Sequence, residues 1–365
     1  MFMFNGKRSK RFLTTVLAIG MFCMNINIAY ASEIGPGYQN IQSVESEDSN
    51  SKGIIRNEGD IARIEEDGVY TYYNKNYYIR DKEIVASDYV GDTWYTKFGV
   101  AASDEVYEFT GGVEEKDKAY WNAINTLASL ELPNEDVTVV KAGFPNQWEV
   151  LAYVNRVESI YNVTETPLHF AFKRMPPDPY VFLVIENSQE NINTARKILE
   201  GMSLIDQTYN DLGFANIEGE EAKIKAIHDW LANNIRYDLT LEKKKGISGL
   251  TEGKMVCAGY TQLFYLFAKK AGIDVEVIGG VGTNDDGSFS MTDNEHIWNR
   301  VKLNGKYKYI DVTWDANVID SINRIDKSRF TEEALNKLKD SMFYHYYLKD
   351  REEFNQDHFG FAAYK

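Results

Sequence analysis

The feature that most constrains the fold of this chain is an asparagine–glycine pair, Asn304-Gly305. It separates two alternating runs, HIWNRVKL and KYKYIDVTWD. Asn-Gly is the strongest short-range signal for a β-hairpin with a two-residue type I′ turn. That turn sets the register, so His296 should face Thr313 on the partner strand. His296 and Asp311 then become diagonal neighbours on one face, roughly 7–8 Å apart at their Cα atoms.

The two faces of this predicted hairpin differ in character. Ile297, Val301, Ile310 and Val312 take the face opposite the polar pair and are expected to join the core. On the polar face, an aspartate bonded to a histidine would fix the imidazole tautomer and stabilise the imidazolium. The pattern therefore predicts an oriented base, with a surface histidine beside a surface aspartate as the alternative.

The N-terminal segment is typical of a secretory signal peptide. Four basic residues precede an apolar run over 12–24, and the segment ends in AYA, a small-x-small cleavage site. We expect a signal peptide over 1–31, cleavage near Ala31, and a secreted or cell-surface protein without a stable membrane span. An uncleaved anchor is the alternative, although the apolar run is shorter than the ~20 residues of a spanning helix.

Cleavage would leave Cys257 as the one remaining cysteine, because the other, Cys23, lies within the signal. An exported protein with a single thiol cannot form an internal disulfide, so the thiol needs another use. The run CAGYTQLFYLFAKKAGI has the pattern of an apolar helix that starts at Cys257 and ends at Gly272. Free N–H groups and partial positive charge at a helix start favour a thiolate. We expect a nucleophile here, with a small buried residue at a helix start as the alternative.

Composition and motifs argue against several other functions. The formal net charge of −15 disfavours nucleic acid and anionic lipid surfaces as partners. None of the histidines lies in an HExxH or paired metal-ligand pattern, and no phosphate loop or dinucleotide fingerprint is present. We therefore expect no metal and no cofactor. The acidic loop Asn284–Gly287 before His296 could bind calcium, but a solvated loop that could act as a lid over the site is preferred.

Composition and periodicity divide the chain into five predicted regions. They are a signal peptide (1–31), a disordered linker (32–60), a small β-rich region (61–113), an α/β accessory domain (114–215) and a catalytic domain (216–365). The linker is polar with few apolar residues. The β-rich region contains a hairpin around Asn74-Lys75-Asn76, whose tyrosines are expected to pack a small sheet, with a carbohydrate-stacking surface as the alternative.

Periodicity also predicts the elements of the last two regions. In the accessory domain we expect helices over 116–132 and 192–202 and strands over 137–143, 149–162, 168–174 and 180–186. In the catalytic domain we expect an amphipathic helix over 220–235, a loop over 242–254, a helix from Cys257 and a strand over 274–281. His228 lies within the amphipathic helix, where a packing or capping role is expected.

Several of these motifs together resemble the transglutaminase-like superfamily, and in particular its secreted bacterial members. The segments are CAGY, HIWNRVKLNGKYKYIDVTWD, the upstream IHDWLANNIRYD and the terminal YHYYLKDREEFNQDHFG, which fall within about 217–360. The resemblance implies an α+β fold with a papain/transglutaminase-like core, in which the nucleophile helix packs on an antiparallel sheet. Smaller β-rich and α/β regions would precede this core.

The resemblance also implies roles for individual residues. Cys257 matches the nucleophile, His296 the general base and Asp311 the orienting carboxylate. Substrate-binding or supporting positions are matched by Trp298, Asn299, Gly259, Tyr260 and Trp314.

The function that these roles predict is that of a secreted thiol enzyme, which attacks peptide or carboxamide bonds and forms a thioester. Release by water would make it a cysteine peptidase or amidase, and transfer to an amine would make it a transglutaminase. The expected substrate is a peptide or protein, for example a cell-wall stem peptide or a surface protein. The alternative is a non-catalytic binding or scaffold protein of the cell surface that keeps the transglutaminase-like fold.

Overall fold

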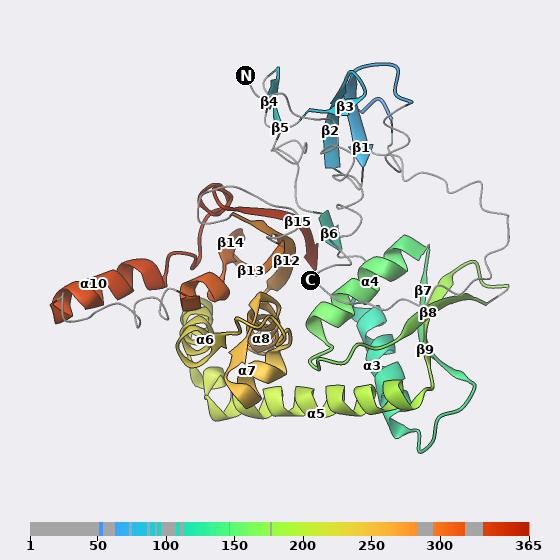
Figure 1. Ribbon diagram of the computed structural model, residues 1–365. Coiled ribbons are helices and arrows are strands. Elements are labelled where there is room, and N and C mark those ends of the chain that lie inside the picture. Colours follow the sequence, from blue (N-terminus) through green and yellow to red (C-terminus); the bar gives the residue numbers. More distant parts are fainter. Residues whose placement is uncertain are drawn as a thin grey trace. The chain divides into compact units, whose positions relative to one another are not determined.

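A computed structural model shows an α+β fold, as predicted (Figure 1). It describes residues 51–53, 63–72, 75–85, 88–91, 93–95, 107–109, 113–145, 147–175, 177–283, 295–317 and 331–364. The predicted signal peptide, most of the predicted linker and the acidic loop before His296 lie outside these residues. Within the described parts, no helix has the length and apolarity needed to cross a membrane.

The chain forms two compact units, and the first contains the β-rich region. Its strands are β1 (Gly68–Tyr72), β2 (Lys75–Arg80), β3 (Glu83–Ile84), β4 (Asp88–Val90) and β5 (Thr93–Tyr95). The predicted hairpin is confirmed, but Tyr72 pairs directly with Lys75, so Lys75 and Asn76 belong to a strand and not to the turn. Tyr77 and Ile79 are buried, in accord with a packing role for at least this tyrosine.

The second unit runs from Phe109 to Lys365 and holds both the predicted accessory and catalytic regions. The boundary between those regions near residue 215 stays a prediction. The first part contains α3 (Val113–Ser129), β7 (Val137–Phe144), α4 (Gln147–Ile160), β8 (Phe170–Arg174), β9 (Val181–Glu186) and α5 (Gln189–Asp211). Its strands form an antiparallel sheet in the order β7-β9-β8.

The strand predicted over 149–162 is wrong, because this segment forms most of helix α4. Its many valines and tyrosines are typical of strands. Their spacing is helical, since they recur three or four residues apart and share one face. The residues on that face are fully buried: Val150, Tyr153, Val154, Val157 and Ile160.

The loop predicted over 242–254 is also wrong in part, because it contains a short helix and a strand. The elements between α5 and the end of the helix that starts at Cys257 are η1 (Phe214–Asn216), α6 (Glu220–Asn234), β10 (Arg236–Tyr237), α7 (Gly246–Glu252), β11 (Lys254–Met255) and α8 (Cys257–Lys270). A Cβ at Gly246 would lie 2.6 Å from Leu263, and one at Gly249 would lie 2.6 Å from the Met255 sulfur. These glycines permit close packing of α7, although in the sequence they suggested a loop.

A five-stranded sheet carries the hairpin predicted from Asn304-Gly305. Its order is β14 (Lys306–Ile310), β13 (Glu295–Leu303), β12 (Val275–Gly282), β15 (His358–Tyr364) and β6 (Tyr107–Phe109). Leu303 pairs with Lys306, which confirms the predicted register. Both turn residues have positive φ, 52° and 78°, as a type I′ turn requires.

The ladder of this hairpin is shorter than predicted. It ends at the pair Asn299–Ile310, and a helical turn begins at Val312. The expected facing pair of His296 and Thr313 is therefore not formed. The remaining helices are α10 (Glu332–Phe343) and α11 (Arg351–Phe354).

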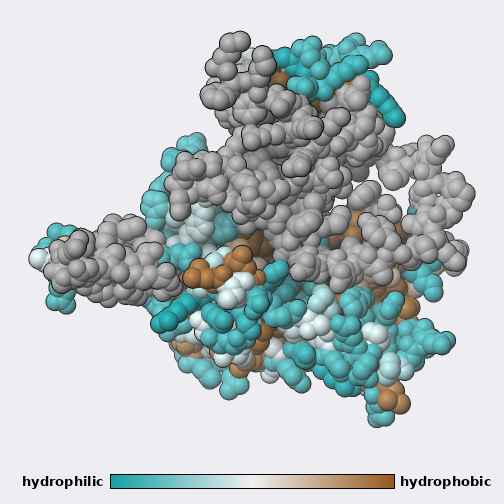
Figure 2. Space-filling model, viewed as in Figure 1, coloured by the Kyte–Doolittle hydropathy of each residue, from teal (hydrophilic) through white to brown (hydrophobic). Residues whose placement is uncertain are grey.

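Helix α8 is the centre of the core. It contacts strands β12 and β13 as well as helices α5, α6 and α7 (Figure 1). Ten consecutive residues from Gly259 to Ala268 are buried, so the helix is enclosed on all sides. The predicted core residues of the hairpin, Ile297, Val301, Ile310 and Val312, join the same apolar cluster. The coloured part of the surface in Figure 2 is largely hydrophilic, with scattered apolar residues.

Candidate active site

Cys257 occupies the first position of helix α8, as the sequence predicts. Its thiol is free and half-buried. The preceding residue, Val256, is extended, and its N–H donates to the Lys243 carbonyl at 2.8 Å. The helix ends at Lys270, and Gly272, with φ 80°, follows the C-cap residue Ala271. The thiol is thus held where the helix N-terminus favours negative charge.

His296 and Asp311 form a buried pair beside this helix start. His296 Nε2 lies 2.5 Å from Asp311 Oδ2, and the two residues are only 7% and 1% exposed. The other carboxylate oxygen accepts the N–H groups of Thr313 at 2.9 Å and Trp314 at 3.2 Å. The helical turn that shortens the hairpin thus orients the aspartate, and the predicted hydrogen bond forms without the predicted strand pairing.

The electrostatics of the pair favour the ionised state. Burial alone would lower the pKa of His296, but Asp311 and a hydrogen bond with Cys257 raise it to about 10. Burial acts against the Asp311 carboxylate too, yet its contacts with His296 and His358 hold its pKa well below the usual range. Because Nε2 contacts Asp311, Nδ1 is the ring nitrogen left for the thiol. Cys257, His296 and Asp311 are thus linked in the order that nucleophilic catalysis requires.

A second histidine, His358, contacts the same aspartate and was not among the predicted site residues. Its Nε2 lies 3.2 Å from Asp311 Oδ2, and its Nδ1 lies 2.7 Å from Asp357 Oδ1. It is fully buried at the start of β15, which pairs with β12 and not with the hairpin strands. Its only signal in the sequence was its place in the terminal segment EFNQDHFG.

This geometry agrees with a comparison of the sequence with known families. Residues 209–313 match the family model of the transglutaminase-like superfamily. This part of the chain belongs to that superfamily. Its members include thiol enzymes, and the match spans both Cys257 and the His296–Asp311 pair.

Named relatives cover only part of this chain. Kyphoscoliosis peptidase of Mus musculus is 28% identical over 172 residues, which make up 44% of this chain and 24% of that protein. The Homo sapiens kyphoscoliosis peptidase is 29% identical over 119 residues, or 30% of this chain and 17% of that protein. The chain thus spans about a quarter or less of the length of these curated relatives.

Solved structures give weaker likenesses. A protein described as a cysteine protease from Cytophaga hutchinsonii is 16% identical with a TM-score of 0.26, covering 40% of this chain and 62% of that chain. A protein whose crystal structure is described as that of a TGase is 14% identical with a TM-score of 0.25, and the match covers 57% of this chain and 59% of that chain. These scores are low, so the assignment of the transglutaminase-like domain rests on the matched sequence segment.

Aromatic rings pack against His296 in the transglutaminase-like domain. The Trp314 ring stacks on His296 with centroids 5.3 Å apart and planes inclined by 24°. Trp298 lies 5.8 Å from the same imidazole and packs against Phe354. Gly282 leaves room for this arrangement, because a Cβ there would lie 2.8 Å from the Trp314 ring. The structure therefore places the two predicted tryptophans next to His296.

The other predicted supporting residues, Asn299, Tyr260 and Gly259, lie in or beside helix α8. Asn299 Nδ2 donates to the carbonyls of Thr261 and Glu276, so it ties the helix to the sheet. The Tyr260 hydroxyl donates to the Ile235 carbonyl at 2.6 Å. Gly259 allows close approach, since a Cβ there would lie 2.7 Å from Met255. In this structure these three residues hold helix α8 in place, and with it Cys257 at its start.

His228 takes part in a second buried histidine–aspartate pair. Its Nε2 lies 2.9 Å from Asp315 Oδ2, and its Nδ1 lies 3.0 Å from Asp229 Oδ1. The expected packing role is confirmed, because the side chain is fully buried and its ring contacts Phe343 and Tyr347. Burial opposes the charged form, but the two carboxylates raise the pKa of His228.

This second pair is joined to Asp311 through backbone hydrogen bonds. Asp315 Oδ1 accepts the Tyr346 N–H at 2.9 Å, and the Tyr346 carbonyl accepts the Asp311 N–H at 3.0 Å. The Asp315 N–H in turn donates to the Asp311 carbonyl at 3.2 Å. His228 therefore helps to fix the segment that carries Asp311.

One group of side chains in the described parts has the composition of a metal site. His296, Asp311 and His358 offer ligand atoms within 4.8 Å of one another. The Nε2 atoms of His296 and His358 both lie within hydrogen-bond distance of Asp311 Oδ2, so each of the three side chains has a partner within the protein. The calcium alternative for the acidic loop before His296 concerns residues outside those described.

Proposed function

We propose that this protein is a thiol enzyme that acts on peptide or carboxamide bonds through Cys257, His296 and Asp311. The observation that carries the proposal is the 2.5 Å contact between His296 and Asp311 beside Cys257 at a helix start, and interaction with this thiol helps to raise the pKa of His296. A thiolate–imidazolium pair of this kind is the reactive form of cysteine hydrolases and acyltransferases.

The chemistry follows from these positions. The Cys257 thiolate attacks the substrate carbonyl carbon, and the carbonyl electron pair moves to oxygen, where N–H groups at the start of α8 can stabilise it. Collapse of this intermediate expels the amine or ammonia, which takes a proton from the His296 imidazolium. A thioester on Cys257 remains, and His296 is then neutral and able to act as a base.

The second half of the reaction decides the type of enzyme. If His296 removes a proton from water, hydroxide attacks the thioester and the products are a carboxylic acid and the free thiol. If it removes a proton from a primary amine, the product is a new amide. We propose a peptide or protein substrate, with cell-wall stem peptides or surface proteins reached after export. The peptidase name of the mammalian relatives supports hydrolysis, although those proteins match over a quarter of their length or less.

Mass spectrometry of the products tests the proposal. Wild type and Cys257→Ala are incubated with peptidoglycan fragments and with glutamine-containing proteins, with and without a primary amine. Fragments identify a peptidase, replacement of a carboxamide by a carboxylate identifies an amidase, and loss of ammonia with amine incorporation identifies a transglutaminase. Identical product spectra for wild type and Cys257→Ala would refute a thiol mechanism.

A further inference from the structure

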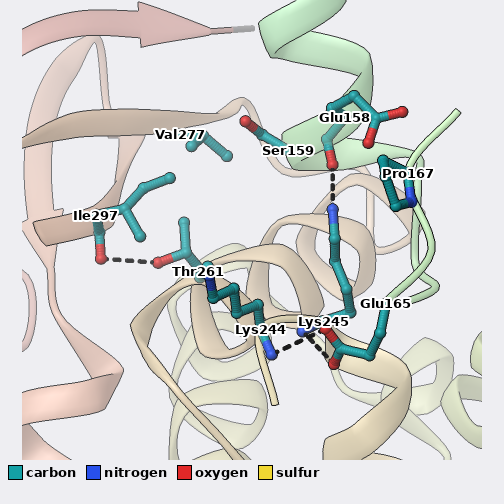
Figure 3. A pocket seen from close by; sticks show the side chains of 10 residues that line it. Glu158, Ser159, Glu165, Pro167, Lys244, Lys245, Thr261, Val277 and Ile297 are labelled. Atoms are coloured by element: carbon teal, nitrogen blue, oxygen red, sulfur yellow. Dashed lines mark hydrogen bonds between the residues drawn. The ribbon is translucent and has the colours of Figure 1, made fainter. Parts of the chain in front are cut away.

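A pocket of about 80 Å³ lies beside the first turn of the nucleophile helix. It is lined by Ala258, which follows Cys257 in the chain, and by Ile297, which follows His296. Thr261 and Val277 complete the wall contributed by α8 and the sheet (Figure 3). The volume exceeds the roughly 10–15 Å³ of such space that a single water needs, so the pocket can take a small functional group.

The opposite wall comes from the accessory region and from the loop before α7. Glu158 and Ser159 stand at the end of α4, and Glu165 and Pro167 stand in the segment that leads to β8. Lys244 and Lys245 close the pocket from the side of α7 (Figure 3). Four of the ten lining residues, Glu158, Ser159, Glu165 and Pro167, thus lie outside the family match, and the pocket they share with α8 is next to Ala258, the residue that follows Cys257.

The two carboxylates of this wall are held by the protein, although Glu158 Oε1 is buried without a hydrogen-bond partner among the described residues. Glu165 accepts the backbone N–H groups of Lys244 at 3.2 Å and Lys245 at 3.0 Å, as well as the Ser248 hydroxyl at 2.9 Å. Glu158 Oε2 accepts from Asn162 Nδ2 at 2.9 Å. In Figure 3 the Glu158 carboxylate turns toward Pro167, whereas its backbone carbonyl accepts from Lys245 Nζ at 2.6 Å.

Lys244 differs from its charged neighbours in the pocket. Its side chain is half-buried and lies beside Thr261 in Figure 3. Among the residues that the structure describes, no acceptor or carboxylate pairs with its ammonium group. Burial lowers the pKa of Lys245, whereas the nearby carboxylates of Glu158 and Glu165 raise it. The charge of Lys244 lowers the pKa of Lys245 further, because the two ammonium groups repel one another. A carboxylate placed beside Lys244 would relieve this repulsion.

The position of Lys244 is set in advance by the loop that carries it. Asp238 Oδ2 accepts the N–H groups of Glu242 at 3.1 Å and Lys243 at 3.0 Å, just before Lys244. Glu165 holds the next two backbone N–H groups, as described above. A loop anchored on both sides of a charged residue loses little conformational entropy when a ligand binds.

We propose that this pocket is a carboxylate-binding subsite, in which Lys244 pairs with an acidic group of the substrate near the bond that Cys257 attacks. The proposal deepens the function proposed above and rests on it. The acidic group is a side-chain or a C-terminal carboxylate of a peptide. The accessory region then has a defined role, because it supplies one wall of the substrate site.

Peptide binding to full-length Cys257→Ala, which cannot turn over its ligand, tests the subsite. The probes are short fluorescent peptides in which one glutamate scans an otherwise neutral, C-amidated sequence, each matched by its glutamine counterpart. A parallel neutral set with a free C-terminus separates the two sources of the carboxylate. We expect one acidic position to bind roughly tenfold tighter than its neutral match, as for a hydrogen bond to a charged group.

Second-site variants assign this preference to Lys244. In Cys257→Ala with Lys244→Met the preference should disappear, and with Lys244→Glu it should turn toward a lysine at the same position. Lys243→Met is the matched control, because Lys243 pairs with Glu252 at 2.6 Å and does not line the pocket. Circular dichroism melts establish that each variant is folded.

Two results would overturn the subsite. One is equal affinity of acidic and neutral peptides at every position and terminus. The other is an acid preference that survives Lys244→Met. Failure of the proposed function is measured separately, by the alkylation rate of Cys257 in the wild-type protein. A rate no faster than that of free cysteine would refute the proposed function, whatever the peptide affinities are.

Discussion

His358 Nε2 lies 3.2 Å from Asp311 Oδ2, the same carboxylate oxygen that His296 Nε2 contacts at 2.5 Å. One aspartate is thus held between two imidazoles, and the second imidazole is fixed in turn by Asp357 at 2.7 Å. The proposed triad of Cys257, His296 and Asp311 therefore continues through His358 to Asp357, which makes a chain of five charged or polar groups. We interpret His358 as a positioning residue, because it acts on His296 only through Asp311.

Replacing His358 by glutamine should weaken the orientation of Asp311. We expect the rate of Cys257 alkylation to fall roughly tenfold, the value of one hydrogen bond to a charged group. The alkaline limb of its pH profile should also move to lower pH, since a less well-held aspartate supports the His296 imidazolium less. His169→Gln is the control, because His169 is partly exposed and its ion-pair partner is Glu190 rather than a residue of the site. An unchanged pH profile in His358→Gln would show that His358 serves packing alone.

The raised pKa of His296 predicts how stability depends on pH. The folded-state pKa of about 10 lies above the value of 6.5 for an unperturbed histidine side chain. The protonated histidine therefore contributes its full stabilisation below about pH 6.5, and this contribution is lost as the pH rises through about 10. Urea unfolding across this range should show a decline in the free energy of unfolding. A decline of the same size in His296→Gln would assign the effect to other groups.

Two glycines of strand β12 offer a matched pair of substitutions. A Cβ at Gly282 would lie 2.8 Å from the Trp314 ring that stacks on His296, whereas a Cβ at Gly279 would have no neighbour within 4 Å. Gly282→Ala should displace Trp314 and reduce kcat/KM about tenfold or more, because a small misplacement of catalytic groups is costly. Gly279→Ala should leave kcat/KM unchanged. Equal kinetics for both variants would mean that the Trp314 stacking is irrelevant to the reaction.

Loss of the second buried pair should affect folding first. His228→Ala leaves Asp315, which is fully buried, without its charged partner. Breaking a buried pair from one side costs roughly 3–5 kcal/mol of unfolding free energy. His345→Ala should cost little, since His345 is an exposed histidine in the same segment as Tyr346. Denaturant midpoints for the two variants measure the difference, and equal midpoints would contradict a stabilising role for the His228–Asp315 pair.

The sequence predicted most of the site because the relevant signals are local. The Asn304-Gly305 turn sets the register of its hairpin by itself, and the apolar run after Cys257 sets the helix. The triad then needs one long-range contact, between the helix start and the hairpin. Residues whose role depends on further long-range contacts were missed: His358 reaches Asp311 only through the order of strands in the sheet.

Errors in the fold had a different physical origin. In α4, residue composition favoured a strand while the spacing of the buried residues was helical, and the tertiary structure follows the spacing. In α7, glycines that suggested a loop are required for close packing on neighbouring side chains. The pocket beside Ala258 could not be predicted, because its two walls come from segments about 100 residues apart in the sequence.

The central claim is that Cys257 is a nucleophile activated by His296. The most direct measurement is the rate at which iodoacetamide alkylates Cys257 at about pH 6, where an unperturbed thiol is almost fully protonated. Peptide mapping distinguishes this residue from Cys23. We predict that Cys257 reacts many times faster than free cysteine and that His296→Ala abolishes the difference. A rate equal to that of free cysteine, or one that is the same in wild type and His296→Ala, would contradict the claim.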